Sequence, residues 1–237
     1  MRIVVFQHLA CEHPGIWRDF LREDGADVVT VELDAGDTLP SLDGADALLV
    51  FGGPMNVDEH DRFPWLAPET ASIREAALGA LPVFGVCLGA QLLARALGAP
   101  VTKNPSPEVG LLEVELTAAG TSDPLFEGWP RRAPVVQWHS DTFALPPGAT
   151  LLATSPACRH QAFRHGRCAY GLQFHPEVTA DMVEEWGEIP EYAAAMRRMQ
   201  AGSGGGPFAG VPGESPAMAR RARLLYRNFM ALVARQT

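Results

Sequence analysis

The sequence predicts an α/β fold: an open, mostly parallel, twisted sheet with helices on both faces, flavodoxin-like, with a small antiparallel extension. Short runs rich in Val, Ile and Leu alternate with segments of helical apolar spacing through the first hundred residues. From Gly110 to Gly171 the pattern changes to shorter alternating runs separated by Pro and Gly. Such runs are typical of antiparallel strands.

The first half of the chain supplies the expected parallel strands. Residues 2–8 read as the first strand, and the helix after it carries apolar residues from Ile16 to Leu21. A second strand is expected at 28–33 and a third within 45–54, where an apolar run enters a glycine loop.

Of the next three expected elements, the last two are joined almost directly. An Ala-rich helix covers residues 65–81 and is followed by a continuous apolar strand ending at Val86. A helix over 88–97 follows with almost no connection. A strand buried on both faces explains the unbroken apolar run.

We expect residues 1–237 to form a single domain. Residues 201–215 are rich in Gly and Pro and are expected to be a mobile loop, either a lid or a simple connector. Apolar residues at helical spacing predict a terminal helix over 216–235, with its arginines on the solvated face.

Composition excludes several classes of protein. A net charge of −9 argues against a general nucleic-acid binder, because such affinity depends on phosphate neutralisation by Lys and Arg. Lys103 is the only lysine, which argues against lysine-based chemistry. The four cysteines lack the dense spacing of a disulfide scaffold, and no apolar segment has membrane-spanning length. We therefore expect a cytoplasmic protein without membrane association.

The arrangement strand, Gly85-Val86-Cys87-Leu88-Gly89, helix is the strongest chemical signal. It is the nucleophile-elbow pattern with Cys in place of Ser, in which flanking glycines relieve crowding at a strained turn. The turn exposes the sulfur at the carboxyl end of the sheet and beside the positive end of a helix dipole. A buried, inert cysteine explains neither glycine.

A base and its orienting group are expected in the segment 171–178. In an extended chain residues i and i+2 face the same side, so His175 and Glu177 can point together, with Pro176 stiffening the segment between them. One imidazole nitrogen would then face the carboxylate and the other the thiol.

The glycine loop after the third strand supplies a third element. Gly52-Gly53-Pro54 lets the backbone approach a substrate and aim its amides. The Gly53 amide, together with the amide of Leu88, suits an oxyanion hole.

The motifs GGP, G-x-C-x-G-x-Q and Q-F-H-P-E occur in this order between Arg2 and Val178. This combination resembles the class I (triad) glutamine amidotransferases, especially the free-standing subgroup similar to the amidotransferase domain of GMP synthetase. The resemblance implies that Cys87 is the nucleophile, His175 the general base and acid, and Glu177 the orienting carboxylate. It also implies that glutamine is cleaved through a γ-glutamyl thioester to glutamate and ammonia, without a cofactor or metal.

The same resemblance implies a set of substrate contacts. Gly52 and Gly53 match the oxyanion loop, and Gln91 matches the motif glutamine that helps to hold the substrate. Gln91 lies one helical turn beyond Cys87 and therefore on the same side of the helix. Ser140 and Asp141 match the segment that grips the amino-acid end of glutamine, although Ser140 stands where relatives often have glycine.

The remaining histidines show no zinc-ligand spacing and are expected at the surface or at a pocket rim. They are His8, His13, His60, His160 and His165.

Three functions stay open. The first is an ammonia-supplying glutaminase with a separate synthetase partner. The second is a stand-alone hydrolase or transferase of another γ-glutamyl compound, and the third is a non-catalytic or chaperone-like relative of the fold. The intact triad argues against the third, whereas the first two pass through the same thioester. The sequence does not indicate an oligomeric state.

Overall fold

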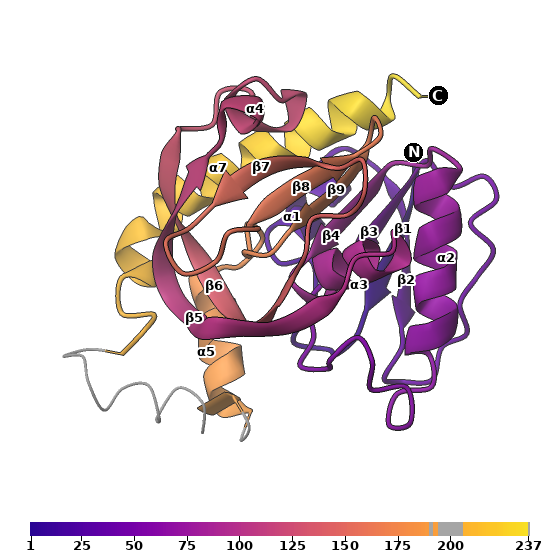
Figure 1. Ribbon diagram of the computed structural model, residues 1–237, viewed down its shortest axis with the longest axis horizontal. Helices are drawn as coiled ribbons and strands as arrows, with labels where there is room; N and C mark the ends of the chain where they lie inside the picture. The colour runs from indigo at the N-terminus through magenta and orange to yellow at the C-terminus, as the bar shows by residue number, and fades with distance from the viewer. Residues whose placement is uncertain (190–191, 194–205, 237) are drawn as a thin grey trace.

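Figure 1 shows the computed structural model, which describes residues 1–189, 192–193 and 206–236. Within these residues nine strands form one sheet in the order β2-β1-β3-β4-β9-β8-β7-β5-β6. Five of the strands pair in parallel. They are β1 (Arg2–Gln7), β2 (Asp27–Glu32), β3 (Ala47–Val50), β4 (Val83–Val86) and β9 (Ala169–Leu172).

The order of these parallel strands confirms the predicted flavodoxin-like fold, because the sheet runs outward in both directions from β1. Helices cover both faces. α1 (Trp17–Glu23) and α7 (Val211–Val233) lie on one face, and α2 (Leu66–Leu78) and α3 (Leu88–Ala96) on the other.

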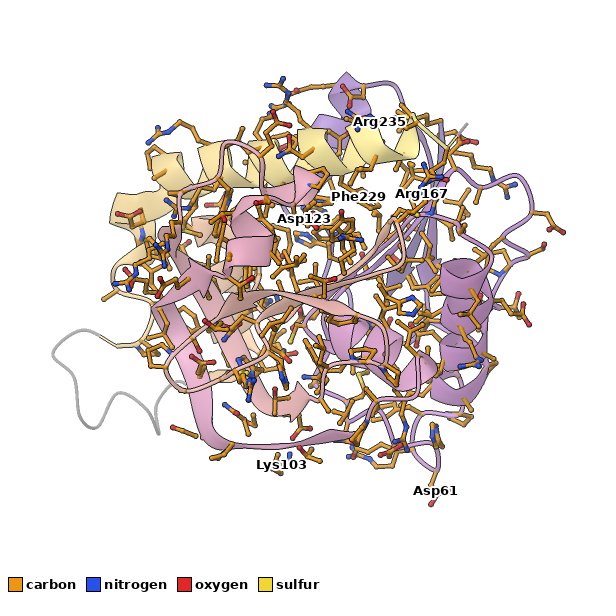
Figure 2. All side chains as sticks on the ribbon, turned by 45° about the horizontal axis from the view of Figure 1, so that its top comes forward. Asp61, Lys103, Asp123, Arg167, Phe229 and Arg235 are labelled. Carbon is orange, nitrogen blue, oxygen red and sulfur yellow. The ribbon has the colours of Figure 1, made fainter. Side chains whose placement is uncertain are left out.

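The alternation of side chains along β1 divides the core into these two layers. Ile3 and Val5 belong to the cluster that contains Trp17 and Phe229, whereas the intervening Val4 packs toward α2 and α3. Successive strand residues face opposite sides, so a strand with an apolar layer on each face is apolar throughout. Figure 2 shows Phe229 between α7 and the sheet.

The antiparallel extension is larger than predicted. β5 (Val101–Leu116) and β6 (Arg132–Phe143), with 16 and 12 residues, are the longest of the described strands. They pair with each other with a register shift between Lys103 and Glu108. The two short helices α4 (Ala118–Thr121) and η1 (Pro124–Phe126) lie between them along the chain, and β7 (Thr150–Thr154) and β8 (Ala162–His165) join the extension to β9.

Two helices differ from the sequence prediction. α7 begins at Val211, inside the segment expected to be a loop, because Phe208 and Val211 are buried in an apolar cluster with Met218. Residues 201–205 of that expected loop lie outside the described residues. α5 (Ala180–Glu188) was not predicted, although Thr179 caps its first turn by accepting a hydrogen bond from the Met182 amide.

The turn from β4 into α3 places Cys87 in a strained backbone conformation. Its φ of 51° and ψ of −107° lie outside the regions that non-glycine residues ordinarily occupy. Both predicted glycines are required by close backbone approach: a Cβ on Gly85 would lie 2.5 Å from the Gly89 carbonyl oxygen, and one on Gly89 would clash with the Val50 carbonyl. The predicted elbow is therefore present.

Among the described helices, none combines the length and apolar character needed to cross a bilayer.

We predict that Gly89→Ala lowers the free energy of unfolding by about 1–3 kcal/mol, because the new methyl group would overlap backbone atoms of β3 that cannot move aside. Urea denaturation measures this change. Gly187→Ala is the matched control: it lies in α5, a Cβ there meets no atom within 4 Å, and stability should be unchanged or rise by about 0.4–1 kcal/mol. Wild-type stability in Gly89→Ala would contradict the close approach at the elbow.

Candidate functional site

A cleft of about 280 Å³ lies at the carboxyl ends of the central strands, with Cys87 in its wall. This is the edge at which open α/β sheets bind ligands. Most residues predicted to form the site also line it, whereas Gly52, Leu88 and Glu177 lie behind the lining. The predicted residues in the lining are Gly53, Cys87, Gln91, Ser140, Asp141 and His175.

The Cys87 side chain is 6% exposed and has two polar neighbours besides the triad. Its sulfur lies 3.6 Å from the Trp138 carbonyl oxygen and 3.7 Å from Nε2 of Gln173. The Cys87 amide donates to the Leu172 carbonyl at 2.8 Å, which ties the elbow to β9. The strained residue is thus held from both the strand side and the helix side.

His175 and Glu177 form a buried pair whose side chains point together, as the i, i+2 spacing predicts. Nδ1 of His175 lies 2.8 Å from Oε1 of Glu177. The His175 amide donates to the Val136 carbonyl of β6 at 2.9 Å, which fixes the backbone that carries the ring.

The pKa of His175 reflects opposing effects. Burial favours the neutral ring, but the charge of Glu177, the charge of Cys87 and hydrogen bonds to both outweigh it and raise the pKa well above 6.5. The buried site therefore favours a protonated His175 ring held by the Glu177 carboxylate.

Backbone amides are available where the sequence predicts an oxyanion hole. A Cβ on Gly53 would lie 2.9 Å from Cδ2 of Leu88, so the two residues are adjacent in space. Among the described residues the amides of Gly53 and Leu88 have no hydrogen-bond acceptor. Gly52 is packed behind this loop, because a Cβ there would lie 2.5 Å from Oε2 of Glu12 and 3.1 Å from Cε1 of His175.

Gln91, Ser140 and Asp141 form a second part of the cleft wall. Nε2 of Gln91 donates to the Asp141 carbonyl at 3.3 Å, so the helix glutamine holds the β6 segment. The Asp141 carboxylate is occupied by Lys103 at 2.7 Å and by Nδ2 of Asn56 at 2.7 Å. Ser140 is exposed at the cleft.

Sequence reasoning missed several residues at the cleft. Lys103 was not predicted at the site, because a single lysine argued against lysine-based chemistry. It lines the cleft and extends from the first part of β5 at the edge of the molecule in Figure 2. Glu12 is buried in the lining and accepts a hydrogen bond from the Tyr192 hydroxyl at 2.9 Å. Glu12 and Tyr192 are 180 residues apart, so no local signal joins them.

His8 contradicts the expectation of a surface or rim position, because its side chain is fully buried. Nδ1 lies 2.9 Å from the Gly52 carbonyl oxygen and Nε2 lies 2.9 Å from Oε1 of Glu69. The buried carboxylate of Glu69 stabilises the ring in the core, which a sequence separation of 61 positions does not indicate.

His139 and Glu108 form a third buried pair beside the cleft. Nδ1 lies 2.9 Å from the Asp141 carbonyl oxygen and Nε2 lies 3.1 Å from Oε2 of Glu108. Ligand atoms of Glu108, His139 and Cys158 lie within 4.8 Å of one another and could hold a metal ion. Glu108 already accepts hydrogen bonds from Ser155 and Gln161, so its charge is satisfied without one.

Comparisons with known proteins agree with this site. The family model described as "Glutamine amidotransferase class-I" matches residues 18–184. The chain is 34% identical over 188 residues to the glutamine amidotransferase-like protein YfeJ of Salmonella typhimurium, covering 78% of this chain and 79% of that protein. It is 36% identical over 165 residues to a subunit of the glutamine-hydrolyzing GMP synthase of Thermoplasma acidophilum, covering 68% and 76% of the two chains.

Solved structures give the same answer for the fold. A glutamine amidotransferase from Thermotoga maritima superposes with a TM-score of 0.87 at 30% identity and covers 98% of each chain. A glutamine amidotransferase from Methylobacillus flagellatus superposes with a TM-score of 0.84 at 28% identity, covering 98% of this chain and 94% of the other. The strand order, the cysteine elbow and these matches together place the chain in the class I glutamine amidotransferase family.

Proposed function

We propose that the protein hydrolyses the side-chain amide of glutamine through a γ-glutamyl thioester on Cys87. The observation that carries this proposal is the strained Cys87 elbow beside the buried His175–Glu177 pair, in a cleft that both Cys87 and His175 line. A nucleophile, a base and a group that orients the base are the parts that covalent acyl transfer needs.

In the first half of the reaction the Cys87 thiolate attacks the γ-carbonyl carbon and a C–S bond forms. Negative charge moves to the carbonyl oxygen, where the Gly53 and Leu88 amides would bind it. The imidazolium of His175 gives its proton to the departing nitrogen, the C–N bond breaks, and ammonia leaves the thioester behind.

In the second half, neutral His175 accepts a proton from water as the water oxygen attacks the thioester carbonyl. The C–S bond then breaks, glutamate is released, and the thiolate again faces an imidazolium. Throughout, Glu177 holds the ring in one orientation and stabilises its positive charge.

A second part of the cleft wall is proposed to hold the amino-acid end of the substrate. Gln91, Ser140 and Asp141 line it, and Lys103 adds a cation beside the Asp141 carboxylate. An α-ammonium and an α-carboxylate need partners of both signs, and this wall presents both.

The ammonia is proposed to pass to a separate synthetase subunit. Support comes from relatives that are named as single subunits of a glutamine-hydrolyzing GMP synthase. Hydrolysis or transfer of another γ-glutamyl compound would use the same residues, so substrate trials decide between the two.

We predict that the purified protein releases ammonia and glutamate from glutamine and that Cys87→Ala lowers kcat by at least about 10³-fold, because no thioester can form. A γ-glutamyl panel run in parallel, containing γ-glutamyl methylamide and γ-glutamylglycine, shows which leaving group is preferred. Cys168→Ala is the matched control, since Cys168 is buried outside the cleft and bonds only weakly to the Ala80 carbonyl and Gln236. Turnover of no γ-glutamyl compound, or full activity in Cys87→Ala, would refute the assignment.

We predict a second effect at Glu177. The pKa of His175 is raised chiefly by the Glu177 charge against burial, so Glu177→Gln lowers that pKa and the imidazolium loses its proton at a lower pH. Less imidazolium then faces the Cys87 sulfur near neutral pH, so alkylation of Cys87 by iodoacetamide should slow there.

The pH profile of alkylation measures this change, and Glu184→Gln, which removes an exposed carboxylate from α5, is the control for net charge. Identical profiles for wild type and Glu177→Gln would show that Glu177 does not support the charged ring.

A further inference from the structure

The Gly52–Gly53 peptide is held from behind by His8. Nδ1 of His8 lies 2.9 Å from the Gly52 carbonyl oxygen in a fully buried position. The carbonyl of Gly52 and the amide of Gly53 belong to one planar trans peptide, so they point in opposite directions. A hydrogen bond that fixes the Gly52 carbonyl away from the cleft therefore fixes the Gly53 N–H toward it.

The orientation of a peptide between two glycines has to be fixed by contacts with other residues. Glycine has no Cβ to restrict rotation, so the Gly52–Gly53 peptide can turn over more readily than its neighbours. Side chains crowd both positions: a Cβ on Gly52 would meet Glu12 and His175, and one on Gly53 would meet Leu88. The orientation of this one peptide cannot be set by its own side chains.

Nδ1 of His8 carries a proton and donates a hydrogen bond to Gly52, because a carbonyl oxygen can only accept one. Burial opposes the charge on His8, but Glu69, the Gly52 carbonyl and the charge of Glu12 outweigh it and raise the pKa of His8. A raised pKa favours the charged ring, and a charged donor makes a stronger hydrogen bond to Gly52 than a neutral one.

The free-energy cost of burying His8 and Glu69 indicates that the pair has a role beyond stabilising the fold. His8 and Glu69 are both fully buried, and among the described residues the second Glu69 oxygen has no hydrogen-bond partner. Replacing such a buried pair with apolar residues is often neutral or stabilising, so folding alone does not explain why the core holds His8 and Glu69 here.

We propose that His8, held by Glu69, is a positioning residue that keeps the Gly53 amide directed at the substrate carbonyl oxygen. The inference rests on the proposed function, because the Gly53 amide binds a substrate oxygen only in the proposed thioester chemistry. Neither residue belongs to the cleft lining, so each acts through the backbone of the Gly52–Gly53 peptide.

Two double variants test this role. His8→Leu with Glu69→Leu replaces the ion pair with apolar side chains and removes the donor to Gly52. His8→Asn with Glu69→Leu differs from it only at position 8, where the Asn amide nitrogen takes the place of Nδ1 and still donates. Leu and Asn have the same branching, so the pair isolates one hydrogen bond.

The expected result is a loss of kcat for glutamine by about 10²–10³-fold in the Leu/Leu variant, which is the loss typical of removing one oxyanion donor. The Asn/Leu variant should keep kcat within about tenfold of wild type, with KM nearly constant in both. Iodoacetamide alkylation of Cys87 should be equal in all three proteins, because it needs the thiolate and no oxyanion hole. Equal kcat in the two double variants, whether high or low, would overturn the proposal.

Crystal structures of the two variants separate this inference from the proposed function. If wild type cleaves no γ-glutamyl compound, the proposed function fails, yet the orientation of the peptide still tests the role of His8. The proposal requires the Gly52 carbonyl to keep its direction in the Asn/Leu variant and to turn in the Leu/Leu variant. The same direction in both would refute it.

Discussion

The positive φ of Cys87 is the constraint on which the rest of the site depends. A residue in this conformation persists only where surrounding contacts fix it. β9 supplies one contact through the Leu172 carbonyl, and α3 supplies another, because the Gln91 amide donates to the Cys87 carbonyl at 3.1 Å. The helix after the elbow also has to approach β3 closely, which is why Gly89 has no side chain. The chemistry is therefore built on a turn whose strain is balanced by the packing of the parallel sheet.

Around this turn lie three buried His–Glu pairs, each of which holds a different part of the site. His175 and Glu177 face the sulfur, His8 and Glu69 hold the carbonyl of Gly52, and His139 and Glu108 hold the carbonyl of Asp141. The rings of His8 and His139 hold backbone carbonyls beside the cleft, so the segments that carry the proposed backbone donors and substrate contacts are supported by side chains behind them. Such support from behind is a general requirement for sites that depend on orientation.

The sequence predicted the parts of this arrangement that are local. The elbow follows from two glycines around Cys87, and the shared direction of His175 and Glu177 follows from the two-residue repeat of an extended chain. The parallel sheet follows from unbroken apolar runs such as residues 83–86. The long-range pairs had no such signal, because His8 and Glu69 meet only when β1 and α2 pack together. The start of α7 was missed for the same reason: a stretch rich in Gly and Pro becomes helical where tertiary contacts bury Phe208 and Val211.

Those contacts at the start of α7 also bear on the chemistry. The Trp138 ring lies 5.2 Å from Phe208 and 5.3 Å from Trp186, and Trp186 in turn lies 5.6 Å from the ring of His175. α5 thus places the Trp186 ring against the imidazole, and Phe208, just before α7, packs on Trp138, whose carbonyl faces the Cys87 sulfur. Aromatic packing excludes water from the His175–Glu177 pair and lowers the local dielectric, which strengthens the attraction between the carboxylate and the imidazolium. α5, which carries none of the recognised motifs, is therefore part of what stabilises the charged ring of His175 in the core.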